Sequence, residues 1–399
     1  MAKGLTEKLK ITPPPEYGIK PVPSNLKNLR FLDYFVLWSS LGVGLLVFWA
    51  GLLLVPGLGL GLALLAILVG HLIGNLFLAL VGTIGSENGI PSMVAVRPSF
   101  GIRSSYLMSI LNVIQLVGWA SFEILVMGQA ADAIMVSVFG YSNYAIWVLV
   151  FGFFVFLLAF GGPLAVIRDW LRKFAIWLIY GLGIWITIIV FTQYDLIALL
   201  NAPSAGTLTF SGGVDLVIAM PISWVPLVAD YNRFSRNSKE DFSGTYIGFL
   251  ITSGWCYALG AITTLATGEP NPVLLIMMIV GPIAAIPSLL IIVTDETDNG
   301  FADVYSAAIS TQNIGDLSKI KQWKLIVIFS IISTALALVF GLSPQFEEYY
   351  TNFLLWIGSV FIPLFGIVII DYFVVKEKKF DIAEMYKREG EYWYWKGLN

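Results

Sequence analysis

The chain has 399 residues, of which 57% are hydrophobic and only 12% are charged. A water-soluble protein of this length needs far more charge on its surface, so the composition excludes that class and indicates an integral membrane protein. The formal net charge is −3 and the basic residues are spread along the chain. This distribution excludes a nucleic acid as partner and makes the lipid bilayer the expected surroundings.

The apolar residues form ten segments, each long enough, or nearly so, to cross a hydrocarbon core of about 30 Å as a helix. We therefore expect an all-α integral membrane protein with about ten transmembrane helices, near residues 31–54, 61–84, 104–136, 144–165, 174–192, 213–229, 243–267, 282–310, 325–342 and 350–373. The expected organisation is a cytoplasmic N-terminal segment (1–30), a transmembrane transporter domain (31–373) and a cytoplasmic C-terminal tail (374–399).

The 23 lysines and arginines all lie in alternate gaps between these segments. The basic groups are Lys3 to Arg30, Arg97 with Arg103, Arg168 to Lys173, Arg233 to Lys239, Lys319 to Lys324, Lys376 to Lys379, and Lys387 to Lys396. By the positive-inside rule these gaps face the cytoplasm. The pattern predicts a multi-pass protein of the cell membrane with both termini inside and an even number of spans.

Two residue types occur once each. Cys256 lies within an apolar segment, which excludes a disulfide bond and a zinc cluster. His71 lies in the second span, where a satisfied polar role in helix packing is favoured over a proton relay.

Ten spans divide into two sets of five, and the odd number in each set gives the sets opposite orientations, as in an inverted repeat. The first helix carries the run Ser39–Gly44, whose two glycines each weaken a helix by roughly 1 kcal/mol. The sixth carries Pro221 and Pro226, which each remove a backbone donor. Both helices are therefore predicted to break within the membrane, which is typical of a transport site. Close packing at the glycines and simple kinks at the prolines are the alternative.

The third span carries a polar stripe. Asn112, Gln115, Trp119 and Glu123 are spaced by three, four and four residues and share one helix face. A carboxyl group near the bilayer centre costs roughly 2.5 to 3.5 kcal/mol, so Glu123 is expected to face a polar interior. The flat indole with amide and carboxyl edges suits a planar heterocycle that has ring nitrogens and an exocyclic amine. A hydrogen bond between helices is the alternative.

The eighth span contains the acidic run Thr294–Asn299, followed by Asp303. A helix starting at Pro272 would bring these acids to the cytoplasmic edge as solvated residues. A start at Pro282 is favoured, and it places Asp295 about 20 Å deep and aligns Asp295, Asn299 and Asp303 on one face. The segment before Pro282 would then be an external re-entrant or surface segment.

Three sequence motifs are distinctive. The first comprises Gly89–Met93 and Arg97–Gly101, the second is Gln115–Trp119, and the third is Ser223–Phe234. Together they closely resemble the nucleobase:cation symporter family 1, over essentially residues 20–399. That family includes cytosine, purine, uracil, allantoin and hydantoin permeases and hydroxymethylpyrimidine transporters. The resemblance implies a LeuT-type fold of two inverted five-helix repeats with broken helices 1 and 6, and a substrate between helices 1, 3, 6 and 8.

The resemblance also implies residue roles. Trp119 matches a tryptophan that stacks on the base, and Glu123 matches a position, often glutamine, that bonds the edge of the base. A carboxylate accepts a hydrogen bond from an amino group, which favours an aminopyrimidine or an aminated purine over a dioxo base such as uracil. Asn299 matches a substrate-binding asparagine of helix 8, although alignment on Tyr305–Ser306 shifts the match by one residue.

In the family an aromatic residue of helix 6 supplies a second stacking face for the base, and its match in this sequence is harder to assign. Alignment on Asp230 puts Pro221 at the aromatic position and leaves Trp224 as a displaced candidate. The expected substrate-binding residues are Gln115, Trp119, Glu123, Ser223, Trp224, Asp295 and Asn299.

The sodium site of the family uses backbone carbonyls at the break of helix 1 and hydroxyls of helix 8. The resemblance therefore implies Na⁺ binding by Leu41, Gly44, Thr294 and Thr297, and the acids around Asp298 leave a proton as the alternative coupling ion. Many members have twelve helices, and the last eight residues resemble the run that leads into the eleventh, so we expect the last two helices to be missing here.

We therefore expect a secondary active symporter, and no enzyme, that imports a nucleobase or related aminated heterocycle with Na⁺ or H⁺ by alternating access. No other cofactor is expected. An amino-acid carrier with a LeuT-type fold is one alternative. A membrane prenyltransferase is another, with magnesium on Asp295, Asp298 and Asp303, although the spans contain no second acidic cluster.

Overall fold

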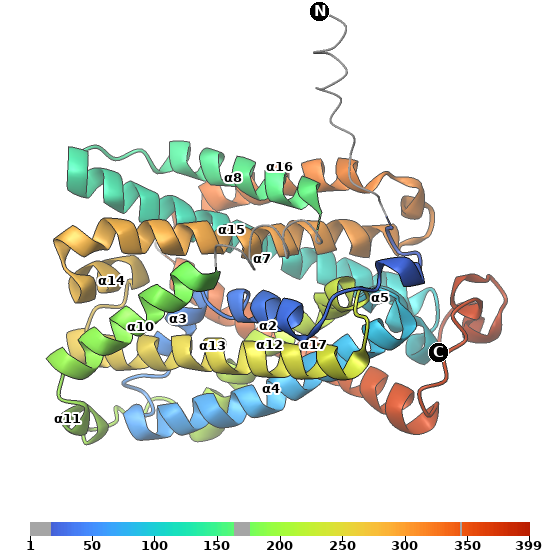
Figure 1. The fold of residues 1–399 in the computed structure, drawn as a ribbon, viewed down its shortest axis with the longest axis horizontal. Helices are drawn as coiled ribbons and strands as arrows, with labels where there is room; N and C mark the ends of the chain where they lie inside the picture. Colours follow the sequence, from blue (N-terminus) through green and yellow to red (C-terminus); the bar gives the residue numbers. More distant parts are fainter. Residues whose placement is uncertain (1–16, 163–175, 344) are drawn as a thin grey trace, which may run out of the picture.

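A computed structural model describes residues 17–162, 176–343 and 345–399 of the chain. Arg168, Arg172 and Lys173, which the charge pattern assigns to one cytoplasmic gap, lie outside these residues. The described part consists of helices and their connections, and the long helices run side by side (Figure 1).

The longer helices are α2 (Phe31–Ser40), α3 (Leu45–Leu52), α4 (Leu60–Asn88), α7 (Ser104–Phe139), α8 (Tyr144–Gly161), α10 (Ile176–Gln193), α12 (Phe210–Asn232), α13 (Ser238–Thr267), α14 (Pro272–Val280), α15 (Pro282–Gln312), α16 (Gln322–Phe340) and α17 (Phe346–Ile370). The short segments are η1 (Ser24–Leu26), α5 (Ser92–Ala95), α6 (Arg97–Phe100), α11 (Leu196–Leu200), η3 (Gly315–Lys319), η4 (Asp371–Val375), η5 (Glu384–Tyr386) and η6 (Glu391–Trp393).

Within the described residues, eight helices are long and apolar enough to cross a membrane, or nine if α2 and α3 form one bent span. Helix α15 is long enough at 31 residues, but its centre carries Asp295, Glu296 and Asp298 and so is less apolar. The expected count of ten spans stays a prediction.

The predicted break in the first span is confirmed. Helices α2 and α3 meet at an angle of 60° across the residues between Ser40 and Leu45. A Cβ atom on Gly42 would lie 2.6 Å from Thr252 Oγ1, and one on Gly44 would lie 2.7 Å from Glu296 Oε1. The glycines therefore allow α13 and α15 to approach the interrupted backbone closely.

The predicted break in the sixth span is wrong, because α12 continues as one helix past both Pro221 and Pro226. Gln115 Nε2 donates to the Ser223 carbonyl at 3.0 Å, and Asn112 Nδ2 donates to the Pro226 carbonyl at 3.2 Å. Side chains of α7 thus contact this stretch of α12, whereas the carbonyls that the prolines leave without a helical N–H partner are those of Val217 and Ile222, four residues earlier.

The predicted start of the eighth span is confirmed at Pro282, and the segment before it forms the short helix α14. Helix α15 then packs along α7 over much of its length. The acidic run consequently lies in the buried middle of the protein, and Asp295, Asp298 and Asp303 are each at most 2% exposed.

The helices form two groups. The first group consists of α2, α3, α4, α12 and α13, in which α13 packs on α2, α3 and α4, and α4 packs on α12. The second group consists of α7, α8, α15 and α16. In Figure 1 the second group lies above the first. The first group contains the first and second spans of each five-helix set, which are α2–α3 with α4 and α12 with α13. The second group contains the third and fourth spans of each set, which are α7 with α8 and α15 with α16. An inverted repeat produces this division.

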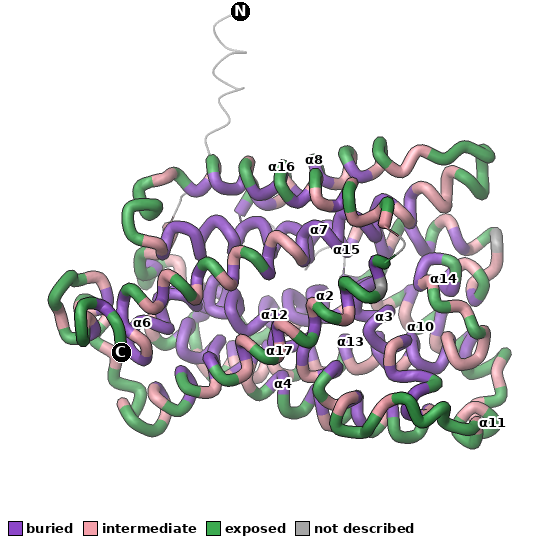
Figure 2. The backbone as a smooth tube through the Cα atoms, turned by 180° about the vertical axis from the view of Figure 1, so that it is seen from behind, coloured by how far each residue is buried: buried purple, intermediate pink, exposed green. Residues whose placement is uncertain are grey.

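The outward faces of the outer helices carry apolar side chains. Leu68 of α4 is 53% exposed, Phe153 of α8 is 57% exposed and Ile331 of α16 is 64% exposed. Figure 2 shows that α12 and the middle of α7 are largely buried, whereas exposed segments lie at the periphery. Exposed apolar faces around a buried polar centre are what a lipid bilayer requires of a multi-pass membrane protein.

Loops that carry basic residues gather at one end of the molecule. The Leu29 amide donates to the Phe234 carbonyl at 3.1 Å, and Arg97 Nη1 donates to the Met385 carbonyl at 2.8 Å. The N-terminal segment, the loop before α7, the loop after α12 and the C-terminal tail therefore meet. We refer to this as the basic end, and its cytoplasmic location stays a prediction.

Candidate functional site

A small cavity lies between the two groups of helices, with an empty volume of about 230 Å³. The break between α2 and α3, together with α7, α12 and α15, supplies its walls. The lining residues are Leu41, Leu46, Val47, Trp119, Glu123, Met220, Trp224 and Asn299. The cavity thus lies among the four spans that the resemblance implies, and it brings Trp119, Glu123, Trp224 and Asn299 together.

Three polar atoms of the lining residues are buried and have no hydrogen-bond partner within the described part of the chain. They are Trp119 Nε1, Glu123 Oε2 and Asn299 Oδ1. Because a buried polar atom without a partner costs about 1–3 kcal/mol, such a set is unusual unless a ligand completes it. The indole nitrogen is a donor, and the carboxyl and amide oxygens are acceptors.

Edge-to-face aromatic contacts hold the two indoles that line the cavity. Trp119 meets Phe353 at a ring separation of 5.3 Å and Tyr350 at 5.9 Å, whereas Trp224 meets Trp38 at 6.1 Å. Packing of this kind fixes a large flat side chain, and a fixed indole is a suitable surface for a planar ligand.

Two of the predicted substrate-binding residues have another use in the structure. Gln115 donates to Asn112 Oδ1 at 2.9 Å as well as to the Ser223 carbonyl, and Ser223 Oγ donates to the Met220 carbonyl at 2.6 Å. Neither Gln115 nor Ser223 lines the cavity. Their side chains support α12 instead, and substrate contact by them stays a prediction.

The acidic run of α15 faces the break in the first span. Glu296 Oε1 accepts from the backbone amide of Leu45, the first residue of α3. Asn299 Nδ2 donates to the Val43 carbonyl at 3.3 Å and to Glu296 Oε2 at 3.3 Å. A carboxylate at the first turn of a helix is stabilised by the helix dipole. Glu296 was not among the predicted site residues.

Asp295 approaches the same break from the α2 side, where Ser40 Oγ donates to Asp295 Oδ1 at 2.9 Å. Both carboxyl oxygens of Asp298 are buried and have no hydrogen-bond partner within the described part of the chain. Asp295 does not line the cavity with Trp119, so its contact with a substrate stays a prediction.

The hydroxyl groups predicted to bind Na⁺ donate hydrogen bonds to carbonyls of their own helix. Thr294 Oγ1 donates to the Leu290 carbonyl at 2.7 Å, and Thr297 Oγ1 donates to the Val293 carbonyl at 3.0 Å. The Gly44 carbonyl accepts from Phe48 of its own helix. Leu41 lines the cavity. A hydroxyl that donates a hydrogen bond keeps its oxygen lone pairs, so Na⁺ binding by the threonines stays a prediction.

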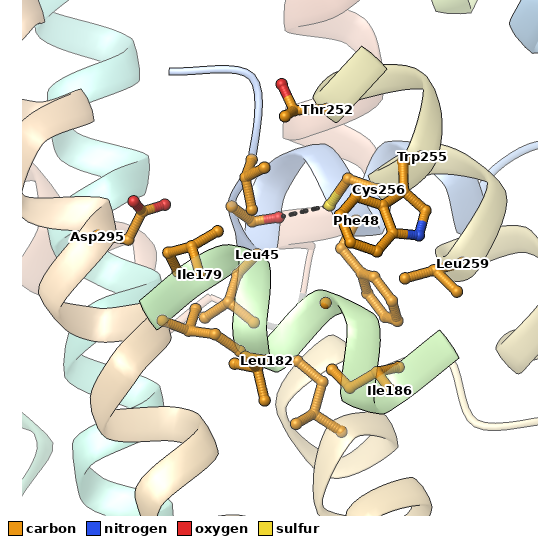
Figure 3. Close-up of a pocket in the computed structure, with 15 residues that line it drawn as sticks. Leu45, Phe48, Ile179, Leu182, Ile186, Thr252, Trp255, Cys256, Leu259 and Asp295 are labelled. Atoms are coloured by element: carbon orange, nitrogen blue, oxygen red, sulfur yellow. Dashed lines mark hydrogen bonds between the residues drawn. The ribbon is translucent and has the colours of Figure 1, made fainter. Parts of the chain in front are cut away.

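A second cavity, with an empty volume of about 550 Å³, lies on the other side of the break. Figure 3 shows Leu182 and Ile186 of α10 beside Phe48 of α3, and the thiol of Cys256 donating to the Gly44 carbonyl at 3.5 Å. Asp295 is its acidic residue. The lining is otherwise almost entirely apolar and offers little to orient a polar ligand.

His71 is satisfied within the helix packing, as the sequence predicts. Its Nδ1 lies 2.8 Å from the Ile67 carbonyl and its Nε2 lies 2.7 Å from Ser253 Oγ.

The fold is that of a LeuT-type transporter. Its first helix is interrupted, its two groups of helices each take spans from both halves of the chain, and a small cavity lies between the groups. The chain belongs to the family of permeases for cytosine/purines, uracil, thiamine and allantoin, whose sequence profile matches residues 21–399.

Individual relatives agree with this assignment. The hydantoin permease of Microbacterium maritypicum is 24% identical, over 91% of this chain and 76% of its own. The cytosine permease of Escherichia coli strain K12 is 27% identical, over 90% of this chain and 81% of its own. The closed, bromovinylhydantoin-bound structure of Mhp1, a nucleobase-cation-symport-1 family transporter, superposes with a TM-score of 0.84 at 21% identity, over 96% of this chain and 87% of that one.

Proposed function

We propose that the protein is a secondary active symporter that imports a planar, aminated heterocycle of the cytosine or purine type together with Na⁺ or H⁺. The substrate lies in the cavity among α2–α3, α7, α12 and α15. Transport proceeds by movement of one group of helices against the other, with the basic end in the cytoplasm.

One observation carries the proposal: the unpartnered polar atoms of the cavity together with its two indoles. Glu123 Oε2 and Asn299 Oδ1 accept hydrogen bonds, and Trp119 Nε1 donates one. A ligand that satisfies all three offers two N–H groups and one acceptor on a flat ring. Aminopyrimidines and aminopurines have this combination, and so do dioxo bases such as uracil, so these atoms support a planar heterocycle with N–H groups, and the amino group is inferred from the carboxyl group of Glu123.

The names of the relatives support a planar nitrogen heterocycle as substrate, since they include a hydantoin permease and cytosine permeases, and cytosine is the one of these two substrates that carries an amino group. An amino-acid carrier would instead use its interrupted helix ends to bind a zwitterion. Here the start of α3 is already occupied by the Glu296 carboxylate. A prenyltransferase has no support from the family, and Asp295 accepts a hydrogen bond from Ser40 at the break.

A ligand screen tests the proposal. The purified protein is heated in detergent with cytosine, adenine, guanine, uracil, hydantoin, hydroxymethylpyrimidine and several amino acids, each with sodium and with potassium. An aminated base should raise the melting temperature, because a ligand that binds only the folded state stabilises it. A response to amino acids alone would overturn the proposal.

The role of Trp119 gives a second test. Trp119→Ala removes a stacking surface worth about 1–3 kcal/mol per base, so the Kd for the best ligand should rise about 5- to 150-fold. Trp395→Ala serves as the control, because Trp395 lies in the C-terminal tail and is 70% exposed. Binding that is unchanged in Trp119→Ala would remove the cavity from the proposal.

A further inference from the structure

The two indoles that line the small cavity belong to different groups of helices. Trp119 lies on α7 of the second group, and Trp224 lies on α12 of the first group. Their edge-to-face partners also differ, since Trp119 packs on Phe353 of α17 and Trp224 packs on Trp38 of α2. These ring contacts hold each indole in its own surroundings. The spacing between the two indoles therefore depends on how α7 is held against α12.

Gln115 ties α7 to α12 close to both rings. It lies one helical turn before Trp119, and its Nε2 donates at 3.0 Å to the carbonyl of Ser223, the residue directly before Trp224. The same Nε2 donates its other hydrogen to Asn112 Oδ1 at 2.9 Å. Because a carbonyl group only accepts, the amide nitrogen must face Ser223, and both of its hydrogens are used.

Asn112 provides a second tie, one turn further from the rings. Its Nδ2 donates to the Pro226 carbonyl at 3.2 Å and to Ser310 Oγ of α15 at 2.8 Å. Asn112, Gln115 and Ser223 are each at most 2% exposed. A buried hydrogen bond is costly to leave unmade, so the two amides together hold α7 and α12 in one register.

We propose that Gln115 is a positioning residue that makes the cavity selective for flat rings. Gln115 does not line the cavity itself, but by fixing α7 against α12 it fixes the gap between Trp119 and Trp224. A gap of constant width favours a planar ring, which stacks on aromatic faces, over a puckered ring of similar composition, which loses part of that contact. This inference rests on the proposed function.

Uracil and 5,6-dihydrouracil test this role, because they carry the same N–H and carbonyl groups and differ only at two ring carbons. Those carbons are trigonal in uracil, which is flat, and tetrahedral in dihydrouracil, which is puckered. Each compound is used to displace radiolabelled cytosine, or radiolabelled adenine if only adenine binds, from the purified protein. In the wild type, uracil should be the better competitor by about tenfold or more, because it keeps its stacking contacts.

Gln115→Met removes both N–H donors and approximately keeps the size of the side chain. The selectivity for uracil over dihydrouracil should then fall by about fivefold or more, because the two indoles are no longer held at one spacing. Ser310→Ala is the matched control. It also deletes a buried hydrogen bond of the same amide network, but it leaves both ties to α12. It should therefore keep the wild-type selectivity.

The selectivity distinguishes positioning from general stability, since both variants should lower the melting temperature but only Gln115→Met should change the selectivity. Unchanged selectivity in Gln115→Met, or an equal loss in Ser310→Ala, would overturn the inference. A wild type that does not discriminate between the two compounds, or that neither compound can occupy, would overturn it as well. Gln115→Leu, which also lacks a donor, replaces Gln115→Met if that variant does not fold. A wild type that binds neither cytosine nor adenine would instead contradict the proposed function.

Discussion

The basic end of the molecule is closed by buried hydrogen bonds, whereas the opposite end is closed by packed aromatic rings. At the basic end, Trp38 Nε1 donates to Asn232 Oδ1 at 3.1 Å and the Tyr34 hydroxyl donates to the Asn232 carbonyl at 3.2 Å. Asn232 Nδ2 in turn donates to Thr245 Oγ1 at 2.9 Å and to Asp241. One side chain therefore joins α2, α12 and α13.

The opposite end relies on rings from α7 and α17. Phe122 lies 5.2 Å from the ring of Phe346 and 5.2 Å from that of Phe353. The hydrogen bond from the Tyr350 hydroxyl to the Leu46 carbonyl, at 2.8 Å, is the polar contact of this cluster with α3. Aromatic contacts of this kind contribute about 0.5–1.5 kcal/mol per pair beyond area burial, and they tolerate several geometries.

This contrast indicates how the two ends open. Buried hydrogen bonds are directional, and breaking one leaves polar groups unpaired, so a connected set separates together or stays intact. Aromatic rings can slide without leaving unpaired groups. We therefore expect the basic end to open in a single step and the aromatic end to open gradually.

The largest expected effect comes from Asn232→Leu. The change leaves Trp38 Nε1 without its partner and removes the amide donor from the Asp241 carboxyl group, and each such loss costs about 1–3 kcal/mol, for a total above about 2 kcal/mol. The melting temperature in detergent should fall sharply, and a cysteine placed on α2 should become reactive from the basic end. Asn201→Leu, at an exposed asparagine, should change neither. An equal loss in both variants would contradict the special role of the basic end.

A smaller effect is expected at the break that lies between the two ends. Gly44→Ala places a Cβ atom 2.7 Å from Glu296 Oε1, so either α3 or the Glu296 side chain must move. Overpacking of this kind costs about 1–3 kcal/mol. Substrate affinity should fall together with the melting temperature.

Gly254→Ala is the matched control for that prediction. Gly254 lies inside α13, and a Cβ atom added there would have open space around it, with no neighbour within 4 Å outside its own helix. Alanine is also the better helix former, by about 0.5–1 kcal/mol. The two substitutions should therefore shift the melting temperature in opposite directions. A shift of the same sign would show that contact with Glu296 is unimportant.

The sequence predicts features that depend on local chemistry. The glycines of the run Ser39–Gly44 identify the break in the first span, and Gly281 with Pro282 identifies the start of α15. The break expected at Pro221 and Pro226 is absent, and this stretch of the continuous helix α12 accepts hydrogen bonds from Gln115 and Asn112 of α7. Those partners are far away in the sequence, so local chemistry cannot reveal them.

The candidate site shows the same limit. Trp119 and Glu123 could be predicted to share a face because they lie on one helix. Asp295 and Glu296 are adjacent, so they point about 100° apart on α15. Which of them reaches the Leu45 amide at the start of α3 depends on the rotation of α15, and spacing alone does not fix that rotation.

The smallest effect that distinguishes the two ends is expected from Tyr350→Phe. This change removes the hydrogen bond to the Leu46 carbonyl but keeps the ring that packs on Phe122. Because the rings provide most of the closure there, the loss should be only about 0.5–1.5 kcal/mol, with little change in transport. Tyr349→Phe, at a neighbouring tyrosine that is 41% exposed, provides the control. If Tyr350→Phe instead destabilised the protein as much as Asn232→Leu, the aromatic end would depend on a directional contact, and both ends would be expected to open in a single step.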